Sequence, residues 1–200
     1  YELDTSAPST PAAPTSYADD VGSVTSTTST ASSTDDTKPG IVVGANLTTT
    51  PTLYVNGVAV SASYDATAGT LTPTNALSAG TYALTYTLKD LAGNESAPSG
   101  ALNVTVDTTS PTTTISGLDI SNDTGTSATD FVTNASSQTV TGTLSAALGA
   151  GEKLYGTVDN GANWIDISSY VTDRSISWTG VTLSGASTLK VEVRNAIGNA

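Results

Sequence analysis

The 200-residue chain lacks cysteine, histidine and methionine altogether. Neither Ser/His/Asp nor Cys/His catalysis can therefore be assembled from its own residues. Zinc sites built from cysteine or histidine are excluded for the same reason. Disulfides, which often cross-link small extracellular domains, cannot form. If the chain is extracellular, a bound metal ion would be a useful substitute for them.

Basic residues are also scarce, since 6 Lys and Arg stand against 18 Asp and Glu, giving a formal net charge of −12. Nucleic acid is not expected as a partner, because its phosphates would repel this charge. Hard cations such as calcium suit it better. No run of about 18 apolar residues exists, so membrane insertion is not expected either. No signal peptide is visible, and we expect the chain to be a piece of a longer protein.

The chain repeats itself with a period close to 100 residues, the size of one immunoglobulin-like sandwich. Three short sequence segments, called landmarks below, each occur twice. Two of them recur 103 residues apart, and the third recurs at nearly that spacing. The matched pairs are Asp4–Pro8 with Asp107–Pro111, Asp20–Gly22 with Asp123–Gly125, and Asp90–Asn94 with Asn195–Asn199.

Between these landmarks, apolar residues alternate with polar ones, which is the pattern of half-buried strands. Asn56-Gly57 between two β-rich runs predicts a hairpin, and Asp159–Gly161 predicts a similar turn. No stretch has helical periodicity. The alternating apolar positions are Tyr82, Leu84, Tyr86 and Leu88, then Leu102, Val104 and Val106, and in the second repeat Leu189, Val191 and Val193.

These patterns predict an all-β chain of two tandem immunoglobulin-like Greek-key β-sandwich domains, arranged as an elongated rod. We assign residues 1–4 to the end of a preceding domain's last strand, 5–107 to the first domain and 108–200 to the second. The last strand of the second domain is expected to be missing unless something replaces it. An open sandwich edge invites pairing with another chain.

Asp residues gather in the loops that this topology brings to the domain ends. The loop after the first strand carries two acidic pairs, and Asp107 ends the last strand at the same pole. Asn195–Asn199 of the second domain should face that pole, so the three groups are predicted to meet at one junction. Crowded carboxylates repel each other unless a cation joins them, and calcium accepts six to eight oxygen ligands with tolerant geometry.

The sequence therefore predicts calcium sites, with ordinary turn residues as the alternative explanation of the same loops. Asp65, Asp159, Asp166 and Asp173 lie outside the repeated pattern and are interpreted as turn or surface residues. No EF-hand loop is present. The candidate metal ligands are Asp4, Asp19, Asp20, Asp35, Asp36, Asp90, Asn94, Asp107, Asp123, Asp130, Asn195 and Asn199.

Three segments that contain candidate ligands resemble parts of bacterial Ig-like (BIg) domains. Asp107–Pro111 resembles their "DTTAP" junction, Ile120–Asn134 their "DDTG…S..TDF.T" loop, and Asp90–Asn94 their "D.AGN" loop. Arrays of such domains occur in giant type I-secreted adhesins and biofilm-associated proteins of Gram-negative bacteria. The resemblance implies calcium at domain junctions, with Asp107, Asp123 and Asp130 as the best matches.

The second repeat departs from the family pattern at two positions. Asn122 and Asn195 stand where Asp is common, and each change removes a charge. Calcium sites in the second domain are therefore expected to be weaker or fewer.

The favoured function is that of calcium-stiffened spacer repeats in a secreted or cell-surface adhesin that mediates host adhesion, biofilm formation and virulence. Its partners would be neighbouring Ig-like domains, with a host glycan or receptor contacted through other parts of the protein. The alternative is a carbohydrate- or receptor-binding module around Trp164 and Trp178, although core positions are the more usual place for such residues. Carboxylate pairs can hydrolyse glycosides, but the acidic clusters lie in repeated pole loops, and an enzyme is not expected.

Overall fold

The computed structural model describes residues 3–200. The chain divides into two compact units, Tyr1–Thr109 and Ser110–Ala200, so the division falls inside the predicted linker Asp107–Pro111. The rod-like arrangement concerns the placement of one unit against the other and stays a prediction. Of the predicted preceding strand, residues 1–2 lie outside the described part, and Leu3 and Asp4 belong to no strand.

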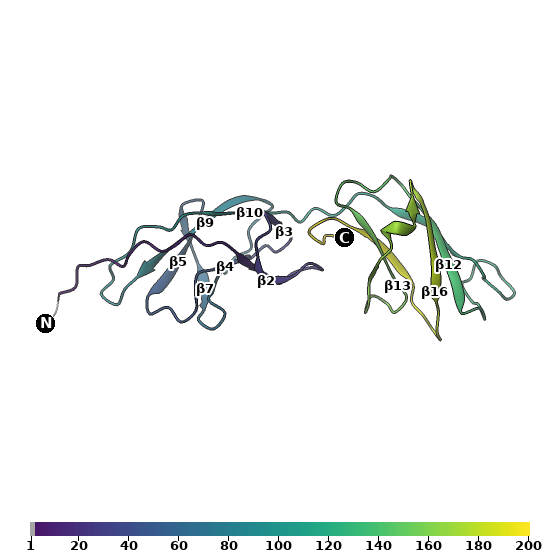
Figure 1. Cartoon of the computed structure of the whole chain (residues 1–200), viewed down its shortest axis with the longest axis horizontal. Helices are drawn as coiled ribbons and strands as arrows, with labels where there is room; N and C mark the ends of the chain where they lie inside the picture. Colours follow the sequence, from purple (N-terminus) through teal and green to yellow (C-terminus); the bar gives the residue numbers. More distant parts are fainter. Residues whose placement is uncertain (1–2) are drawn as a thin grey trace. The chain divides into compact units, whose positions relative to one another are not determined.

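The first unit is a sandwich of two five-stranded sheets (Figure 1). One sheet has the order β2-β1-β4-β8-β7 and the other the order β3-β10-β9-β5-β6. The first sheet consists of β1 (Tyr17–Asp19), β2 (Ser26–Ser29), β4 (Gly40–Val42), β7 (Ala62–Asp65) and β8 (Thr70–Pro73). The second consists of β3 (Ser33–Thr34), β5 (Thr50–Val55), β6 (Val58–Val60), β9 (Gly80–Lys89) and β10 (Leu102–Val106).

The core of the first unit uses the alternation that the sequence shows. Leu84 and Tyr86 of β9 are buried, and Tyr82 and Leu88 of the same face pack against them. Val104 of β10 joins this cluster from the neighbouring strand. The predicted strands at 82–88 and 102–106 are therefore confirmed, and burial of their apolar face stabilises the sandwich.

The hairpin predicted at Asn56-Gly57 is also confirmed. Val55 pairs with Val58 across the turn. Asn56 and Gly57 have φ angles of 50° and 78°. These left-handed conformations are the ones that a two-residue type I′ turn requires and that Asn-Gly adopts readily.

The first part of the chain contributes to both sheets. β1 pairs with β4 in one sheet, whereas β3 pairs in parallel with β10 in the other. This crossing brings Asp19 at the end of β1 close to Asp35, which follows β3 directly. The strand order is that of an immunoglobulin-like sandwich.

The second unit repeats this architecture with a four-stranded and a three-stranded sheet. Their orders are β11-β12-β16-β15 and β14-β13-β17. The larger sheet consists of β11 (Ile115–Ile120), β12 (Ser137–Leu144), β15 (Val171–Thr172) and β16 (Ser175–Thr182). The smaller consists of β13 (Lys153–Thr157), β14 (Ile165–Asp166) and β17 (Lys190–Arg194), and a single 3-10 turn spans Ser168–Tyr170.

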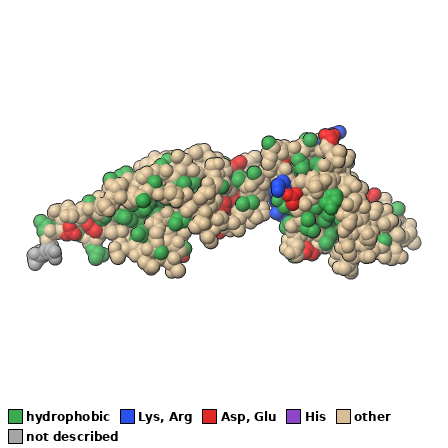
Figure 2. Space-filling view, viewed as in Figure 1, with side chains coloured by type: hydrophobic (Ala, Val, Ile, Leu, Met, Phe, Trp, Pro, Cys, Tyr) green, Lys and Arg blue, Asp and Glu red, His purple; other side chains and the backbone are tan. Residues whose placement is uncertain are grey.

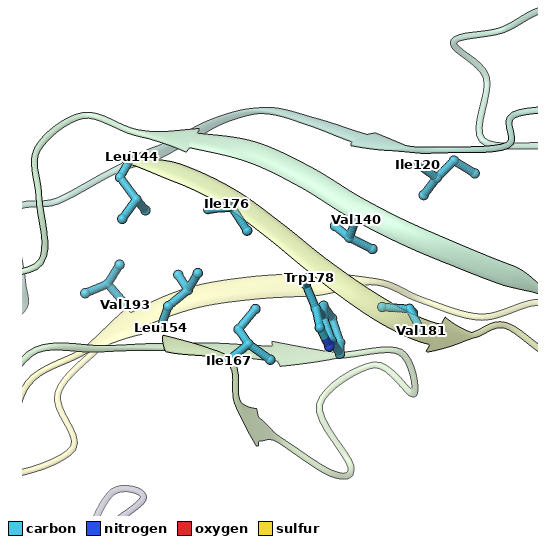
Figure 3. Packing of buried hydrophobic residues seen from close by; sticks show 9 residues of the cluster. All are labelled: Ile120, Val140, Leu144, Leu154, Ile167, Ile176, Trp178, Val181 and Val193. Atoms are coloured by element: carbon cyan, nitrogen blue, oxygen red, sulfur yellow. The ribbon is translucent and has the colours of Figure 1, made fainter. Parts of the chain in front are cut away.

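The core of the second unit forms where apolar side chains of its two sheets point toward each other (Figure 3). Val140 of β12 and Trp178 of β16 face Leu154 of β13 and Val193 of β17. The indole of Trp178 lies beside Ile167 and is only 6% exposed. The all-β sandwich prediction is thus confirmed in both units.

The surface reflects the composition, because basic side chains are sparse on the face drawn in Figure 2. In residues 3–200, no helix is long and apolar enough to cross a membrane.

Candidate metal centres

The structure brings the four acidic residues of the first loop to one pole of the first unit. We call Asp19, Asp20, Asp35 and Asp36 the acidic cluster. Three of its members, Asp19, Asp35 and Asp36, are 3–8% exposed, whereas Asp20 is exposed. Buried carboxylates are rare unless they are paired or bind a metal.

A threonine organises the cluster. The Thr34 hydroxyl donates to Asp19 Oδ2 at 2.8 Å and accepts the backbone N–H of Asp36 at 3.0 Å. Asp36 Oδ1 in turn accepts the backbone N–H of Lys38 at 2.7 Å. Sequence reasoning missed Thr34, since a threonine before two aspartates gives no signal in a chain so rich in Ser and Thr.

Two carboxylate oxygens in this cluster have no hydrogen-bond partner. Asp19 Oδ1 and Asp35 Oδ1 are both buried and unpaired. Burial, followed by the charge of Asp19, raises the pKa of Asp35 above its usual value. Burial also raises the pKa of Asp36, and the charges of Asp20 and Asp19 add to this effect. The cluster is therefore short of positive charge, and its free oxygens are of the kind that calcium binds.

Gly22 packs directly against Asp35 of the acidic cluster. Its φ is +74°, and a Cβ built on it would lie 2.0 Å from Asp35 Oδ2. Only glycine fits both the conformation and the space.

Asp107 lies at the same pole, as predicted from the direction of the strands. Its backbone N–H donates to Thr34 O at 2.8 Å, one residue from Asp35. Asp107 Oδ1 accepts the backbone N–H of Thr109 at 2.9 Å. Hydrogen bonds from Thr109 lower the pKa of Asp107 and so favour its charged form.

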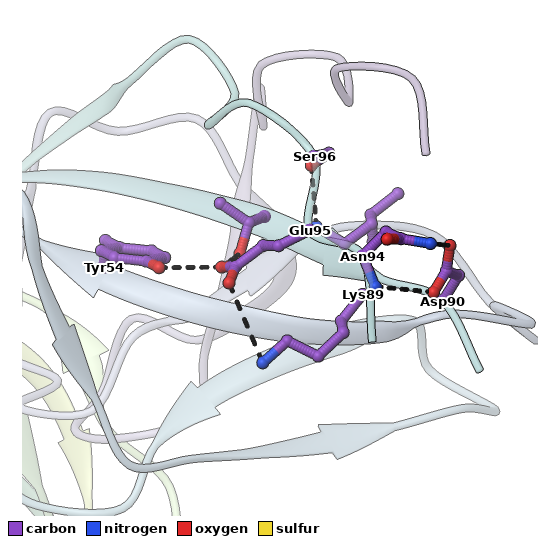
Figure 4. A network of polar contacts seen from close by, with 8 residues as sticks. Tyr54, Lys89, Asp90, Asn94, Glu95 and Ser96 are labelled. Carbon is purple, nitrogen blue, oxygen red and sulfur yellow. Dashed lines mark hydrogen bonds and ion pairs between the residues drawn. The ribbon is translucent and has the colours of Figure 1, made fainter. Parts of the chain in front are cut away.

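A second group forms around Asp90 and Asn94 (Figure 4). The Asn94 side-chain amide donates to Asp90 Oδ2 at 3.0 Å and to the backbone carbonyl of Asp4 at 3.2 Å. The Asn94 backbone N–H donates to Asp90 Oδ1 at 2.8 Å. Asn94 thereby lowers the pKa of Asp90. Both carboxylate oxygens of Asp90 are used to close its own loop, which is the turn-residue alternative for this position.

Beside this loop, Glu95 connects three neighbouring side chains (Figure 4). Glu95 Oε1 accepts the hydroxyls of Tyr54 and Thr87 at 2.9 and 2.6 Å, and Lys89 lies 3.8 Å from Oε2. Sequence reasoning did not single out Glu95. These contacts fix the loop that follows β9.

In the second unit, Asp123 and Asp130 share one loop. Asp123 Oδ2 accepts the backbone N–H of Phe131 at 3.0 Å, and Asp130 Oδ1 accepts that of Val132 at 3.0 Å. Asp123 Oδ1 is buried without a hydrogen-bond partner. Within residues 3–200, this loop thus has one buried, unpaired carboxylate oxygen, whereas the acidic cluster has two.

The loop Asn195–Asn199 closes in the same way as Asp90–Asn94. Asn195 Oδ1 accepts the backbone N–H of Asn199 at 3.0 Å, and the Asn195 N–H donates to Asn199 O at 3.0 Å. The predicted meeting of this loop with Asp107 and the acidic cluster joins two separate units, and it stays a prediction.

No group of three or more acidic side chains in residues 3–200 is arranged as a ready metal cluster. The donor atoms of the acidic cluster are nevertheless of the type that calcium accepts, because the two unpaired carboxylate oxygens, Asp36 and the Thr34 hydroxyl all offer oxygen. Binding there would require these side chains to rearrange.

The two tryptophans do not form a common platform. Trp178 lies in the core, so the alternative of a sugar site built on both indoles is wrong for this residue. Trp164 is partly buried, and the guanidinium of Arg194 lies 4.7 Å from its ring centroid and 4.6 Å from that of Tyr155. Arg194 therefore lies over one face of the Trp164 ring.

Comparison with protein families identifies residues 10–108 as similar to the bacterial Ig-like domain. The match spans the sandwich of the first unit and supports an Ig-like domain there. The second unit has the corresponding strand order, which shows the fold alone. No curated protein matches the chain.

Proposed function

We propose that the chain consists of calcium-stiffened spacer repeats from a secreted or cell-surface bacterial adhesin. The observation that carries this proposal is the pair of buried, unpaired oxygens on Asp19 and Asp35. A sandwich that only needed a turn at this pole would not retain buried carboxylates without partners, because their desolvation destabilises the fold. A divalent ion would neutralise them and turn this cost into stabilisation.

The match to a bacterial Ig-like domain supports this assignment, since such domains are typically non-catalytic modules of surface proteins. A Kd on the order of 10⁻⁴–10⁻³ M would be sufficient in extracellular calcium. Because the ion would bind the folded state only, it would raise the free energy of unfolding with the logarithm of one plus its concentration over Kd. The backbone hydrogen bond from Asp107 to Thr34 supports the inclusion of Asp107 in the proposed site, and occupancy would then also restrict the motion of the segment that follows it.

Calorimetric titration of the 200-residue chain with calcium tests the site. We expect saturable binding that is lost or weakened at least tenfold in Asp35→Asn, which keeps the shape of the side chain but removes its charge. Asp65→Asn is the matched control, because Asp65 is an exposed turn residue that accepts the N–H groups of Thr67 and Ala68. Equal binding by Asp35→Asn and the parent would place the site elsewhere.

The stiffening role is tested separately by small-angle scattering of the same chain. We expect a longer, narrower distribution of particle dimensions with calcium than with chelator. Superimposable profiles under conditions where calorimetry shows calcium bound would remove the spacer mechanism while leaving the metal site.

A further inference from the structure

Several asparagines of the chain stand two residues before a serine or threonine. The tripeptide Asn-X-Ser/Thr, in which X is not proline, is the acceptor sequence for N-linked glycosylation. In a chain so rich in Ser and Thr such tripeptides also arise by chance, so the sequence alone does not identify an acceptor. Transfer requires a side chain that an enzyme can reach. The asparagines concerned are Asn46, Asn94, Asn103, Asn122 and Asn134.

Asn46 lies in the loop between β4 and β5 of the first unit and is exposed. Its backbone N–H donates to Ala66 O at 2.9 Å, whereas its side-chain amide has no hydrogen-bond partner within residues 3–200. Its φ is 52°, a left-handed conformation that asparagine tolerates in turns. Thr48, the third residue of the tripeptide, is exposed as well. Both residues that define this acceptor sequence are therefore accessible.

Tyr64 holds this loop in a defined shape. Its hydroxyl accepts the backbone N–H of Leu47 at 3.0 Å and donates to Gly44 O at 2.7 Å. The turn after β7 packs against the loop, because a Cβ on Gly69 would lie 2.6 Å from the carbonyl carbon of Gly44. These contacts fix the residues on both sides of Asn46 without using its side chain. An asparagine presented on a fixed turn loses little conformational freedom when an enzyme binds it.

The other two tripeptides of the first unit are occupied by the fold. The Asn94 side-chain amide donates to Asp90 Oδ2 at 3.0 Å (Figure 4). Asn103 lies inside β10, where it pairs with Ala83, and the residue that follows it, Val104, is buried. An enzyme could bind that tripeptide only after β10 had left the sheet.

The two tripeptides of the second unit are also held by hydrogen bonds. The backbone N–H of Asn122 donates to Gln138 Oε1 at 2.9 Å. Asn134 Oδ1 accepts the Thr124 hydroxyl at 2.8 Å. Within residues 3–200, Asn46 alone combines a side chain without a hydrogen-bond partner with a tripeptide that lies outside the strands.

We propose that Asn46 is an acceptor site for N-linked glycosylation of the folded chain. Asn46 Nδ2 bonds to the anomeric carbon of a sugar that carries a phosphate leaving group, as nucleotide-linked and lipid-linked sugars do. The bond from the anomeric carbon to the phosphate oxygen breaks, the phosphate keeps its electron pair, and one amide proton passes to the glycosyltransferase. The sugar would cover this loop with a bulky hydrophilic group. This site goes beyond the spacer role and does not depend on calcium.

The test incubates the folded 200-residue chain with UDP-glucose and a soluble N-glycosyltransferase that recognises Asn-X-Ser/Thr. The enzyme is one first shown to modify a synthetic peptide of residues 43–50. Peptide mapping by mass spectrometry should find at least tenfold more hexose on Asn46 than on any other asparagine. Asn46→Gln and Thr48→Ala should abolish this product. Thr48→Ser is the matched control and should retain it, because it preserves the acceptor sequence. Circular dichroism checks that each variant is folded.

Three results would overturn the proposal. The first is a folded chain without hexose on Asn46 under conditions that modify the peptide. The second is undiminished hexose on Asn46 in Thr48→Ala, which would mean that the transfer does not depend on the acceptor sequence. The third is modification of Asn103 as efficient as that of Asn46, which would mean that the fold does not select between the tripeptides.

Discussion

Gly22 and Asp35 approach each other so closely that a Cβ on Gly22 would lie 2.0 Å from Asp35 Oδ2. Gly22 lies between β1 and β2 and Asp35 directly follows β3, yet the glycine forms one wall of the carboxylate's surroundings. The backbone at Gly22 is also left-handed, with φ +74°. The left-handed backbone conformation and the close approach to Asp35 therefore both require glycine at position 22.

Replacing Gly22 by Ala should destabilise the first unit by about 2–3 kcal/mol, because strain at positive φ is added to displacement of the Asp35 carboxylate. Chemical denaturation in chelator measures this. Gly57→Ala is the matched control, since its φ is +78° but nothing lies within 4 Å of its Cβ. The control should lose only about 1 kcal/mol. Equal losses at the two positions would show that the Asp35 contact has no energetic weight.

Asp35→Asn should have opposite effects with and without calcium. In chelator it removes a buried charge and gives the unpaired Asp19 Oδ1 a possible donor, so the first unit should gain up to about 1 kcal/mol of stability. In millimolar calcium the parent should be the more stable protein. Thermal unfolding in both buffers measures the difference, and a destabilised variant in chelator would contradict the charge-repulsion argument.

The stability difference between Asp35→Asn and the parent should depend on pH. Burial raises the pKa of Asp35 in the folded state. The unfolded chain therefore ionises first as pH rises through about 3.8, and the parent loses stability until the raised folded pKa is passed. Without calcium, the two proteins should be equally stable below that range and should diverge above it. A constant difference from pH 3 to pH 7 would contradict the raised pKa.

Asp159 and Asp166 of the second unit should respond to acid in the direction opposite to Asp35. Hydrogen bonds from Thr157 and Asn163 lower the pKa of Asp159 to about 2. The Lys153 ammonium, 2.8 Å away, and Ser168 lower that of Asp166 to about 2. The stability that both groups contribute is present above pH 4 and is lost as pH falls toward 2. Asp166→Asn should flatten this acid loss in the unfolding of the second unit, and an unchanged profile would assign it to other carboxylates.

Gly156 and Trp178 should be coupled in the core of the second unit. A Cβ on Gly156 would lie 2.6 Å from Trp178 Cζ3 and 3.0 Å from Ile167 Cδ1. Gly156→Ala should therefore lose about 1–3 kcal/mol through overpacking. In the double variant with Trp178→Phe, the alanine occupies space that the smaller ring vacates. The combined loss should be smaller than the sum of the single losses by at least about 0.5 kcal/mol, and strict additivity in denaturant unfolding would show no shared packing.

The sequence by itself determined several of the strands and their directions. Alternation at 82–88 and 102–106 identified β9 and β10, Asn56-Gly57 identified a hairpin, and the repeat identified two similar units. These features depend on neighbours along the chain, since side-chain period and turn conformation are local properties. Strand direction alone was enough to place Asp107 at the same pole as the acidic cluster.

Only the tertiary structure decided which carboxylate oxygens have hydrogen-bond partners. Asp90 and Asp35 look alike in the sequence, yet Asp90 is bonded by Asn94 on both oxygens, whereas Asp35 keeps one buried oxygen unpaired. The burial of these carboxylates and the position of the Thr34 hydroxyl beside Asp19 arise from residues brought together across two sheets. Such contacts depend on packing between distant segments, which no local pattern in the sequence specifies.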